Sequence, residues 1–165
     1  MPSADIRRIQ PDEAELYMDI RLEMLKEHPE SFGDSYPDAS QRPIDFYRER
    51  VTDSYIVGAF DQAKIVGTAG YFIQKGKKAE HKAYLWGVYT TKDNRGQGIS
   101  RKLSQRVLDD LPEHIELIQT CVVKGNDTAH EIYKELGFQE YGVEEKGLKV
   151  DGKYYDEILM VKFLK

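Results

Sequence analysis

The chain has few of the features that mark secreted or membrane proteins. One cysteine, Cys121, occurs among its 165 residues, so no internal disulfide can form, which predicts a cytoplasmic protein. No apolar run approaches the roughly 20 residues that a membrane-spanning helix requires, and the N-terminus lacks the apolar core of a signal peptide. A net charge of −5 argues against a general nucleic-acid-binding surface. We therefore expect a globular protein that binds neither membranes nor nucleic acid.

The length and composition fit one domain. A chain of 165 residues can bury most of its apolar surface in a single core. Hydrophobic residues make up 40% and charged residues 32% of the sequence, which is ordinary for a globular protein. We find no internal repeat, low-complexity tract or interdomain linker. The sequence therefore predicts a single domain over residues 1–165.

Hydrophobic periodicity predicts alternating strands and helices. A long polar loop over residues 30–43 separates the first two helices, and ordered loops of this length often contact ligands. The element order βααβββαβαββ predicts a mixed sheet with helices packed on it. The predicted strands cover residues 6–9, 55–60, 65–72, 84–89 and 115–123, with two more around the turn at 150–153; the predicted helices cover residues 12–27 (with Asp12 as the cap), 44–51, 99 to the stop at Leu111-Pro112, and 126–137.

The stretch from Asn94 to Ser100 is the strongest candidate for a binding site. It follows an apolar run and opens a helical pattern. Gly96 and Gly98 permit positive φ and close approach of the backbone, and a helix start offers unpaired N–H donors. Arg95 adds further donors. This pattern favours an anion, specifically a pyrophosphate, although a simple turn and helix cap is the alternative; a P-loop and a dinucleotide fingerprint both fail on spacing, the latter because Arg101 replaces its third glycine.

Two motifs resemble those of a known family. The segment Arg95-Gly96-Gln97-Gly98-Ile99-Ser100 resembles the phosphate loop Arg/Gln-x-x-Gly-x-Gly/Ala of the GNAT superfamily of CoA-dependent N-acetyltransferases. The family's second signature has an Asn, an Ala and a Tyr on the next helix, matched here by Asn126, Ala129 and Tyr133, and ends in Leu136-Gly137-Phe138. Both motifs occur in the correct order on opposite sides of one strand. The chain is therefore identified as a member of this superfamily, with Ser100 replacing the usual Gly or Ala and Thr90-Thr91-Lys92 replacing Val-x-Pro.

The resemblance implies an α+β fold and acetyl-CoA as co-substrate, with no metal. The implied fold is a central, mostly antiparallel twisted sheet of about seven strands with a splayed parallel pair, flanked by about four helices. The backbone around Val88 is implied to pair with the pantetheine arm, and the loop amides to hold the pyrophosphate. The residues implied to bind acetyl-CoA are Val88, Tyr89, Thr90, Arg95, Gly96, Gln97, Gly98, Ile99, Ser100, Arg101, Asn126 and Tyr133.

Tyr133 is the residue that the resemblance implies for catalysis. A tyrosine has a reference pKa near 10, above the 8.5 of a thiol, so it stays protonated at neutral pH and can donate to the departing CoA sulfur. Position 133 also falls on the apolar stripe of its helix, so a purely packing role is the alternative. The base that deprotonates the amine stays open among Glu27, His81, Asp156, Glu157 and a water chain. Cys121 is expected in the core, and Trp86 either in the core or beside the acceptor.

The resemblance places the amine acceptor between residues 21–36 and 154–157. Phe32, Tyr36, Tyr154 and Tyr155 are expected to line an aromatic pocket there. The acidic side chains Glu23, Glu27, Glu30 and Asp34 slightly favour a cation such as a polyamine, while an amino compound, a peptide amine or an antibiotic stays open. The expected function is direct acetyl transfer from acetyl-CoA to a primary amine in a ternary complex. A non-catalytic acetyl-CoA sensor or interaction module is the alternative, and a homodimer stays open.

Overall fold

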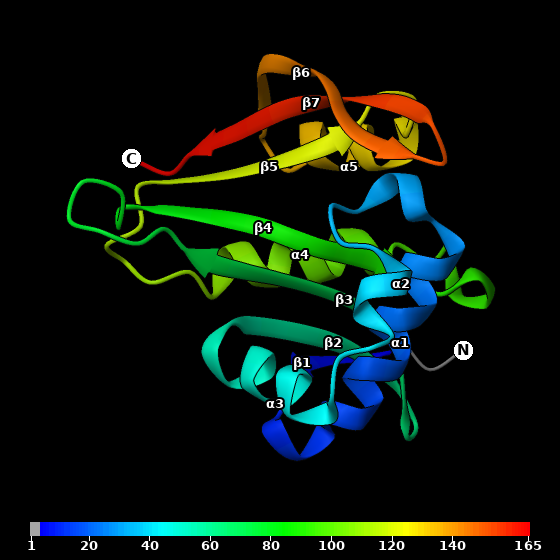
Figure 1. The fold of residues 1–165 in the computed structure, drawn as a ribbon. Helices are drawn as coiled ribbons and strands as arrows, with labels where there is room; N and C mark the ends of the chain where they lie inside the picture. Colours follow the sequence, from blue (N-terminus) through cyan, green and yellow to red (C-terminus); the bar gives the residue numbers. More distant parts are fainter. Residues whose placement is uncertain (1–3) are drawn as a thin grey trace.

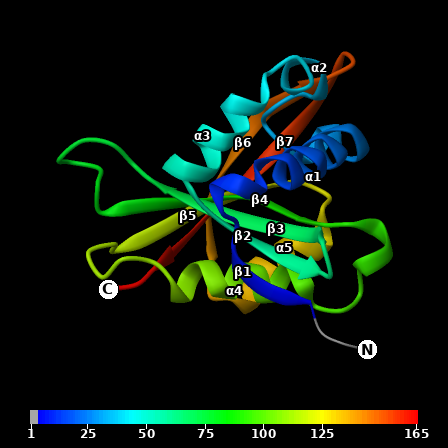
Figure 2. The same ribbon diagram turned by 90° about the horizontal axis from the view of Figure 1, so that it is seen from below.

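The computed structural model describes residues 4–165, which form one seven-stranded sheet covered by helices on both faces (Figures 1 and 2). The strand order is β1-β2-β3-β4-β5-β7-β6, and β4 with β5 is the single parallel pair among the described strands. The predicted fold class is confirmed. The strands are β1 Asp5–Arg8, β2 Tyr55–Asp61, β3 Lys64–Ile73, β4 Lys82–Thr90, β5 Leu117–Val123, β6 Gln139–Val150 and β7 Lys153–Phe163.

Five α-helices lie among the described residues, one more than the sequence predicts. The additional helix, α2, is four residues long and lies within the loop that the sequence leaves without regular structure. The Ser35 hydroxyl caps it by accepting a hydrogen bond from the amide of Asp38, a role that serine favours at helix starts. None of the described helices has the length and apolar character needed to cross a membrane. The helices are α1 Ala14–Glu27, α2 Tyr36–Ala39, α3 Ile44–Asp53, α4 Ile99–Asp109 and α5 Asp127–Glu135.

The start of the first helix corrects one prediction. A 3-10 turn, Pro11–Glu13, precedes α1, and Gln10 is its cap, while the predicted cap Asp12 is exposed in the first turn. Glu13 Oε1 accepts the Gln10 amide at 2.9 Å and both carboxylate oxygens bind Arg7, at 2.8 and 2.7 Å. These bonds, chiefly those from Arg7, lower the pKa of Glu13. Arg7 of β1 therefore holds the Glu13 carboxylate in position to accept the Gln10 amide, as in a capping box.

Two apolar cores hold the sheet between its helix layers (Figure 2). On one face, α4 and α5 pack on the sheet through fully buried side chains that include Leu103 and Leu85. On the other face, α1 and α3 cover β2 and β3 through Met24, Leu25 and Tyr47. The face under α1 and α3 also meets the chain's long first loop, so ligand access to the sheet is decided on that side.

The parallel pair separates shortly after it forms, as the family resemblance implies. β4 and β5 pair only from Lys82–Tyr84 against Leu117–Gln119, after which β4 stays with β3 and β5 stays with β7. The hydroxyl of Thr120 donates to the Leu85 carbonyl at 2.9 Å and so replaces the first lost ladder bond. Beyond this point the two strands present facing edges to each other (Figure 1), and such edges offer unpaired backbone groups.

A bulge at Gly87 bends β4 where the strands separate. Gly87 has φ +63°, a conformation that glycine adopts without steric cost. The β3–β4 register shifts between Thr68 and Gly70, and the Thr68 hydroxyl donates to the Gly87 carbonyl at 2.8 Å. Bulges of this kind re-aim the following residues. Gly87 and Val88 therefore leave the regular ladder beside the open edge, and pairing with β3 resumes at Tyr89 opposite Thr68.

Candidate functional site

The loop before α4 presents a row of free backbone donors. Gly96 has φ +79° and Gly98 has φ +73°, the positive values that the sequence predicts. The amide of Arg95 bonds to Lys92, and the amide of Lys102 bonds to Gly98. Between them, the six amides of Gly96–Arg101 have no hydrogen-bond acceptor within the described chain. Six free N–H groups in a glycine loop at a helix start can form a cradle for an anion of pyrophosphate size.

The charged side chain beside this cradle points elsewhere. Arg95 Nε donates to the Thr90 carbonyl at 3.1 Å, and its Nη2 donates to Glu27 Oε1 at 3.1 Å. Its guanidinium carbon lies 5.7 Å from the centre of the Tyr89 ring. Arg95 thus ties the loop to α1 through its side chain and leaves the anion cradle to the backbone. A contact between this side chain and a phosphate stays a prediction.

Two further residues of this loop, and Asn126 before α5, have partners within the protein. The Ser100 and Thr90 hydroxyls lie 2.6 Å apart, which joins the first turn of α4 to the end of β4. Arg101 forms an ion pair with Glu135 on α5. Asn126 caps α5, since its side chain accepts the Ala129 amide at 3.3 Å. The structure therefore gives these side chains local roles that position the cradle, and their contact with CoA stays a prediction.

Tyr133 lies on α5 against the separated strands. The side chain is 5% exposed and packs on Phe138 with ring centres 5.7 Å apart. Burial raises its pKa above 10, the neighbouring Cys121 raises it further, and a hydrogen bond with Thr120 partly offsets the rise. The phenol is therefore protonated at neutral pH. Since Thr120 also bonds to Leu85 of β4, the hydroxyl of Tyr133 lies where the two strands part.

Cys121 is part of a polar network rather than the apolar core that the sequence predicts. The side chain is partly exposed. The Tyr84 hydroxyl donates to Cys121 Sγ at 3.1 Å, and the thiol donates to Glu157 Oε2 at 3.0 Å. Burial, with the Glu157 bond, raises the pKa of the thiol to about 12. The network links β4, β5 and β7 on the face opposite α5, at the same separation of the strands.

The other candidate bases have different surroundings. Glu27 accepts a 2.6 Å hydrogen bond from the Tyr89 hydroxyl, and this bond, with Arg95, lowers the carboxylate pKa. Asp156 Oδ1 accepts the amide of Lys146 at 2.9 Å within the last hairpin. His81 precedes β4, at the end of that strand opposite the glycine loop. Glu27 thus bonds to Tyr89 of β4, and Glu157 bonds to Cys121 of β5, both beyond the point where the two strands stop pairing.

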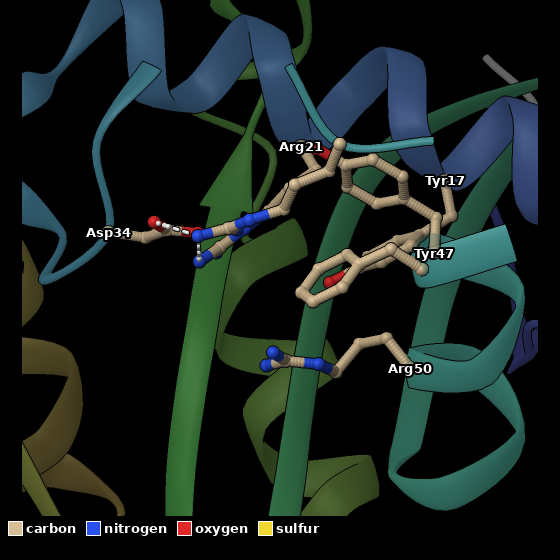
Figure 3. A pocket seen from close by; sticks show the side chains of 7 residues that line it. Tyr17, Arg21, Asp34, Tyr47 and Arg50 are labelled. Carbon is tan, nitrogen blue, oxygen red and sulfur yellow. Dashed lines mark hydrogen bonds and ion pairs between the residues drawn. The ribbon is translucent and has the colours of Figure 1, made fainter. Parts of the chain in front are cut away.

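A pocket of about 200 Å³, part of it open to solvent, lies over β4 on the α1 side (Figure 3). The guanidinium groups of Arg21 and Arg50 extend to the same side of Tyr47. Trp86 of β4 lies beside both, with each guanidinium carbon 5.3 Å from its ring centre. Trp86 thus lies beside two arginines of the lining and also packs against the core under α1 and α3, so both alternatives that the sequence leaves open stay open. The lining residues are Tyr17, Arg21, Asp34, Arg42, Phe46, Tyr47 and Arg50.

The pocket only partly matches the predicted acceptor region. Phe32 lies near it, with its ring 5.9 Å from the guanidinium carbon of Arg21. Tyr36, Tyr154 and Tyr155 instead lie beside lysine side chains, away from this lining. The 3-10 turn Pro29–Ser31 contacts β5 and β6, so the long loop does reach the last hairpin.

Sequence reasoning missed the contribution of α3. Arg42 and Arg50 fall outside both predicted acceptor segments, and Tyr47 is hidden in an ordinary helical stripe. Spacing alone offers one weak signal, since Phe46 and Arg50 are four residues apart and share a helix face. Their convergence with Arg21 requires the packing of α3 against α1.

The acidic side chains expected to attract a cation have internal partners. Glu23 and Glu27 both accept hydrogen bonds from the Tyr89 hydroxyl. Glu30 lies 3.7 Å from His28, and Asp34 binds Arg42. These contacts give each carboxylate a partner within the chain, and a cationic acceptor such as a polyamine stays a prediction.

Comparisons with known proteins point to one family. The model of the "Acetyltransferase (GNAT) family" matches residues 21–138. An acetyltransferase of the GNAT family from Streptococcus pneumoniae superposes with TM-score 0.85 at 20% identity, covering 97% of this chain and 99% of that chain. A ribosomal-protein-alanine N-acetyltransferase from Brucella melitensis gives 0.83 at 21%, covering 97% and 99%. A Salmonella typhimurium protein solved with its cofactor acetyl-CoA gives 0.83 at 16%, covering 100% and 95%. No curated protein matches the chain in sequence.

Proposed function

The chain belongs to the GNAT acetyltransferase family, and from this premise we propose that it transfers an acetyl group from acetyl-CoA to a primary amine. The acceptor is a small amino compound or a peptide amine, and transfer is direct, within a ternary complex. The observation that supports the proposal is the row of six free amides over Gly96–Arg101 beside the open edge of β4. A cradle for pyrophosphate and an edge for the pantetheine arm lie next to each other.

The residues of the chain fit acetyl-CoA along this edge. Acetyl-CoA supplies an acetyl group activated as a thioester. The amides of Gly96–Arg101 would hold its pyrophosphate, and the backbone of Val88–Thr90 would bind the pantetheine arm as a neighbouring strand does. An amide at Val88 or Tyr89, re-aimed by the Gly87 bulge, would donate to the thioester oxygen as negative charge develops on it. Asn126 holds the start of α5 on the other side of the arm.

Tyr133 donates the proton that the reaction requires on sulfur. Its hydroxyl lies where β4 and β5 separate, and burial keeps it protonated by raising its pKa. As the C–S bond of the thioester breaks, negative charge develops on the sulfur, and the Tyr133 hydroxyl can donate its proton there. The amine nitrogen must lose its own proton before it attacks. We propose Glu157 as the group that takes this proton, because its carboxylate bonds to Cys121 of β5 just beyond the last paired residues of β4 and β5.

The substitution Tyr133→Phe tests this role. Phenylalanine keeps the ring packed on Phe138 and removes only the proton donor, and general acids typically contribute about 100-fold to 10,000-fold. We expect kcat to fall at least tenfold while the affinity for acetyl-CoA changes little. The measurement is CoA thiol release with an accepted amine, together with acetyl-CoA titration by calorimetry.

Tyr71→Phe is the matched control for loss of a buried phenol. Tyr71 is 8% exposed and stacks on Tyr55 at the far end of β3, so its substitution should leave kcat within about twofold. An unchanged kcat in Tyr133→Phe would remove Tyr133 from the mechanism. If a broad amine panel releases no CoA from wild type while acetyl-CoA still raises the melting temperature, the non-catalytic sensor becomes the correct function.

A further inference from the structure

The pocket over β4 contains more positive than negative charge. Three arginines, Arg21, Arg42 and Arg50, line it with one carboxylate, Asp34. Asp34 is bound by Arg42 at 2.6 and 3.0 Å, and Arg21 lies farther from the same carboxylate, at 3.7 Å. Arg50 has no carboxylate within 4.0 Å in the described part of the chain; it lies against Phe46 and Trp86 instead. The lining therefore has a formal charge of +2.

Arg21 is the least solvated of these cations. The residue is 8% exposed, and its guanidinium lies near the rings of Trp86 and Phe32, at 5.3 and 5.9 Å. Its one hydrogen bond among the described residues goes to the Met24 sulfur at 3.4 Å, a weak acceptor. A buried charge without full pairing is costly. Within the described range, Arg50 thus presents guanidinium donors without a carboxylate partner, and Arg21 shares Asp34, at 3.7 Å, with the more closely bound Arg42.

These donors lie next to the strand edge where acetyl transfer is proposed. A Cβ placed on Gly87 would lie 3.7 Å from Arg21 Nη1, so the guanidinium is in contact range of the β4 bulge. Val88, whose backbone is proposed to bind the thioester arm, is the next residue. A group bound to Arg21 would therefore lie close to the proposed position of the thioester.

We propose that the acceptor is an amine that also carries an oxyanion, either a carboxylate or a phosphonate, which Arg21 and Arg50 bind. This inference rests on the proposed N-acetyltransferase function and specifies its substrate class. Guanidinium forks match both oxyanions in geometry. The oxyanion would neutralise the pocket and hold the amine against the open edge of β4.

Trp86 provides a binding signal that does not depend on turnover. It is the single tryptophan of the sequence and contacts both guanidinium groups. Its emission is titrated in the CoA-bound protein with L-amino acids, with their decarboxylated amines, and with aminoalkylphosphonates. We expect at least one amino acid or aminophosphonate to bind saturably and at least tenfold more tightly than its decarboxylated amine. Which of the two series binds identifies the oxyanion.

Arg50→Gln and Arg48→Gln form the matched pair of variants. Both lie on α3, but Arg48 is exposed and pairs with Asp45 outside the pocket. Arg50→Gln should weaken binding of the anionic amine at least tenfold and leave acetyl-CoA affinity unchanged, whereas Arg48→Gln should change neither. Arg21→Lys, which retains the charge, should weaken binding less than Arg50→Gln.

Three results would overturn the inference: equal binding of an amino acid and its decarboxylated amine, no effect of Arg50→Gln, or no signal from any anionic amine at 10 mM. These outcomes are separate from a failure of the proposed function. If acetyl transfer fails but the inference holds, an anionic amine would bind through Arg50, yet no CoA would be released.

Discussion

Gly98 at the start of α4 provides a direct test of the anion cradle. It is the N-cap of α4 with φ +73°, and a Cβ built on it meets no atom within 4 Å. Substitution by alanine would therefore cause no steric clash, and its only free-energy cost in the folded state is the left-handed backbone conformation. A left-handed conformation costs a non-glycine residue about 1–2 kcal/mol, while the lower entropy of the unfolded alanine chain returns about 0.4–1 kcal/mol. The expected net destabilisation of Gly98→Ala is about 1 kcal/mol.

The effect on ligand binding should exceed the effect on the apo protein. A loss of about 1 kcal/mol corresponds to a decrease of about 2–4 °C in the melting temperature of a chain of this size. If the backbone of the variant relaxed to relieve the strain at position 98, the free amides of Gly96–Arg101 would change their orientation. Since a ligand that binds only the native state raises the melting temperature by mass action, the shift given by millimolar acetyl-CoA should shrink in Gly98→Ala. Differential scanning fluorimetry with and without acetyl-CoA measures both effects.

Gly33→Ala is the control for this substitution. Its Cβ also meets nothing within 4 Å, and its φ lies outside the left-handed region. Gly33→Ala should therefore be neutral or stabilising by up to about 1 kcal/mol, with the acetyl-CoA shift unchanged. If Gly98→Ala matches Gly33→Ala in both measurements, the cradle is not formed by the backbone of this loop. If acetyl-CoA fails to shift the wild-type melting curve, the CoA site is wrongly placed.

Two further predictions concern the stability of the framework. Burial raises the pKa of Asp34, but bonds from Arg42 and Ser35 outweigh burial and leave the pKa below its ordinary 3.8. The ionised Asp34 therefore stabilises the folded state at pH values above 3.8. This contribution is lost as the pH falls through the lower pKa of the folded state. Asp34→Asn should lower the melting temperature at pH 7 and flatten its decline below about pH 4, and an equally steep decline in the variant would contradict this. Gly67→Ala would place a Cβ 2.9 Å from Leu103 Cδ1 and 3.1 Å from the Tyr89 carbonyl, so we expect about 1–3 kcal/mol of destabilisation in urea titration, with stability equal to wild type as the refuting result.

The sequence predicts the features that depend on local backbone chemistry. Hydrophobic periodicity locates the principal strands and helices, because each element must bury one face. The glycines at 96 and 98 predict positive φ, because no other residue tolerates it as readily, and both angles are positive. The separation of β4 from β5 follows from the family resemblance alone, since no periodicity encodes where a parallel pair ends.

The sequence does not predict the partners that distant side chains select. Besides the phosphate contact that stays a prediction, the guanidinium of Arg95 binds the Thr90 carbonyl and Glu27 of α1, and Glu27 lies 68 positions earlier in the chain. Cys121 is expected in the core, but Glu157 and Tyr84 make its surroundings polar. Each outcome depends on a tertiary contact between segments far apart in the chain. Local patterns contain no information on such contacts.

The two ends of the proposed site therefore differ in how they are encoded. The acetyl-CoA end is formed by the backbone of one short loop and one strand edge, which a few glycines are enough to specify. The acceptor end is formed by side chains from α1, α3 and the loop between them, and Arg21 and Arg50 meet only because those helices pack together. Substitutions in α3 can thus change the acceptor without disturbing the acetyl donor. Membership of the family consequently constrains the donor, whereas we propose that Arg21 and Arg50 select the amine.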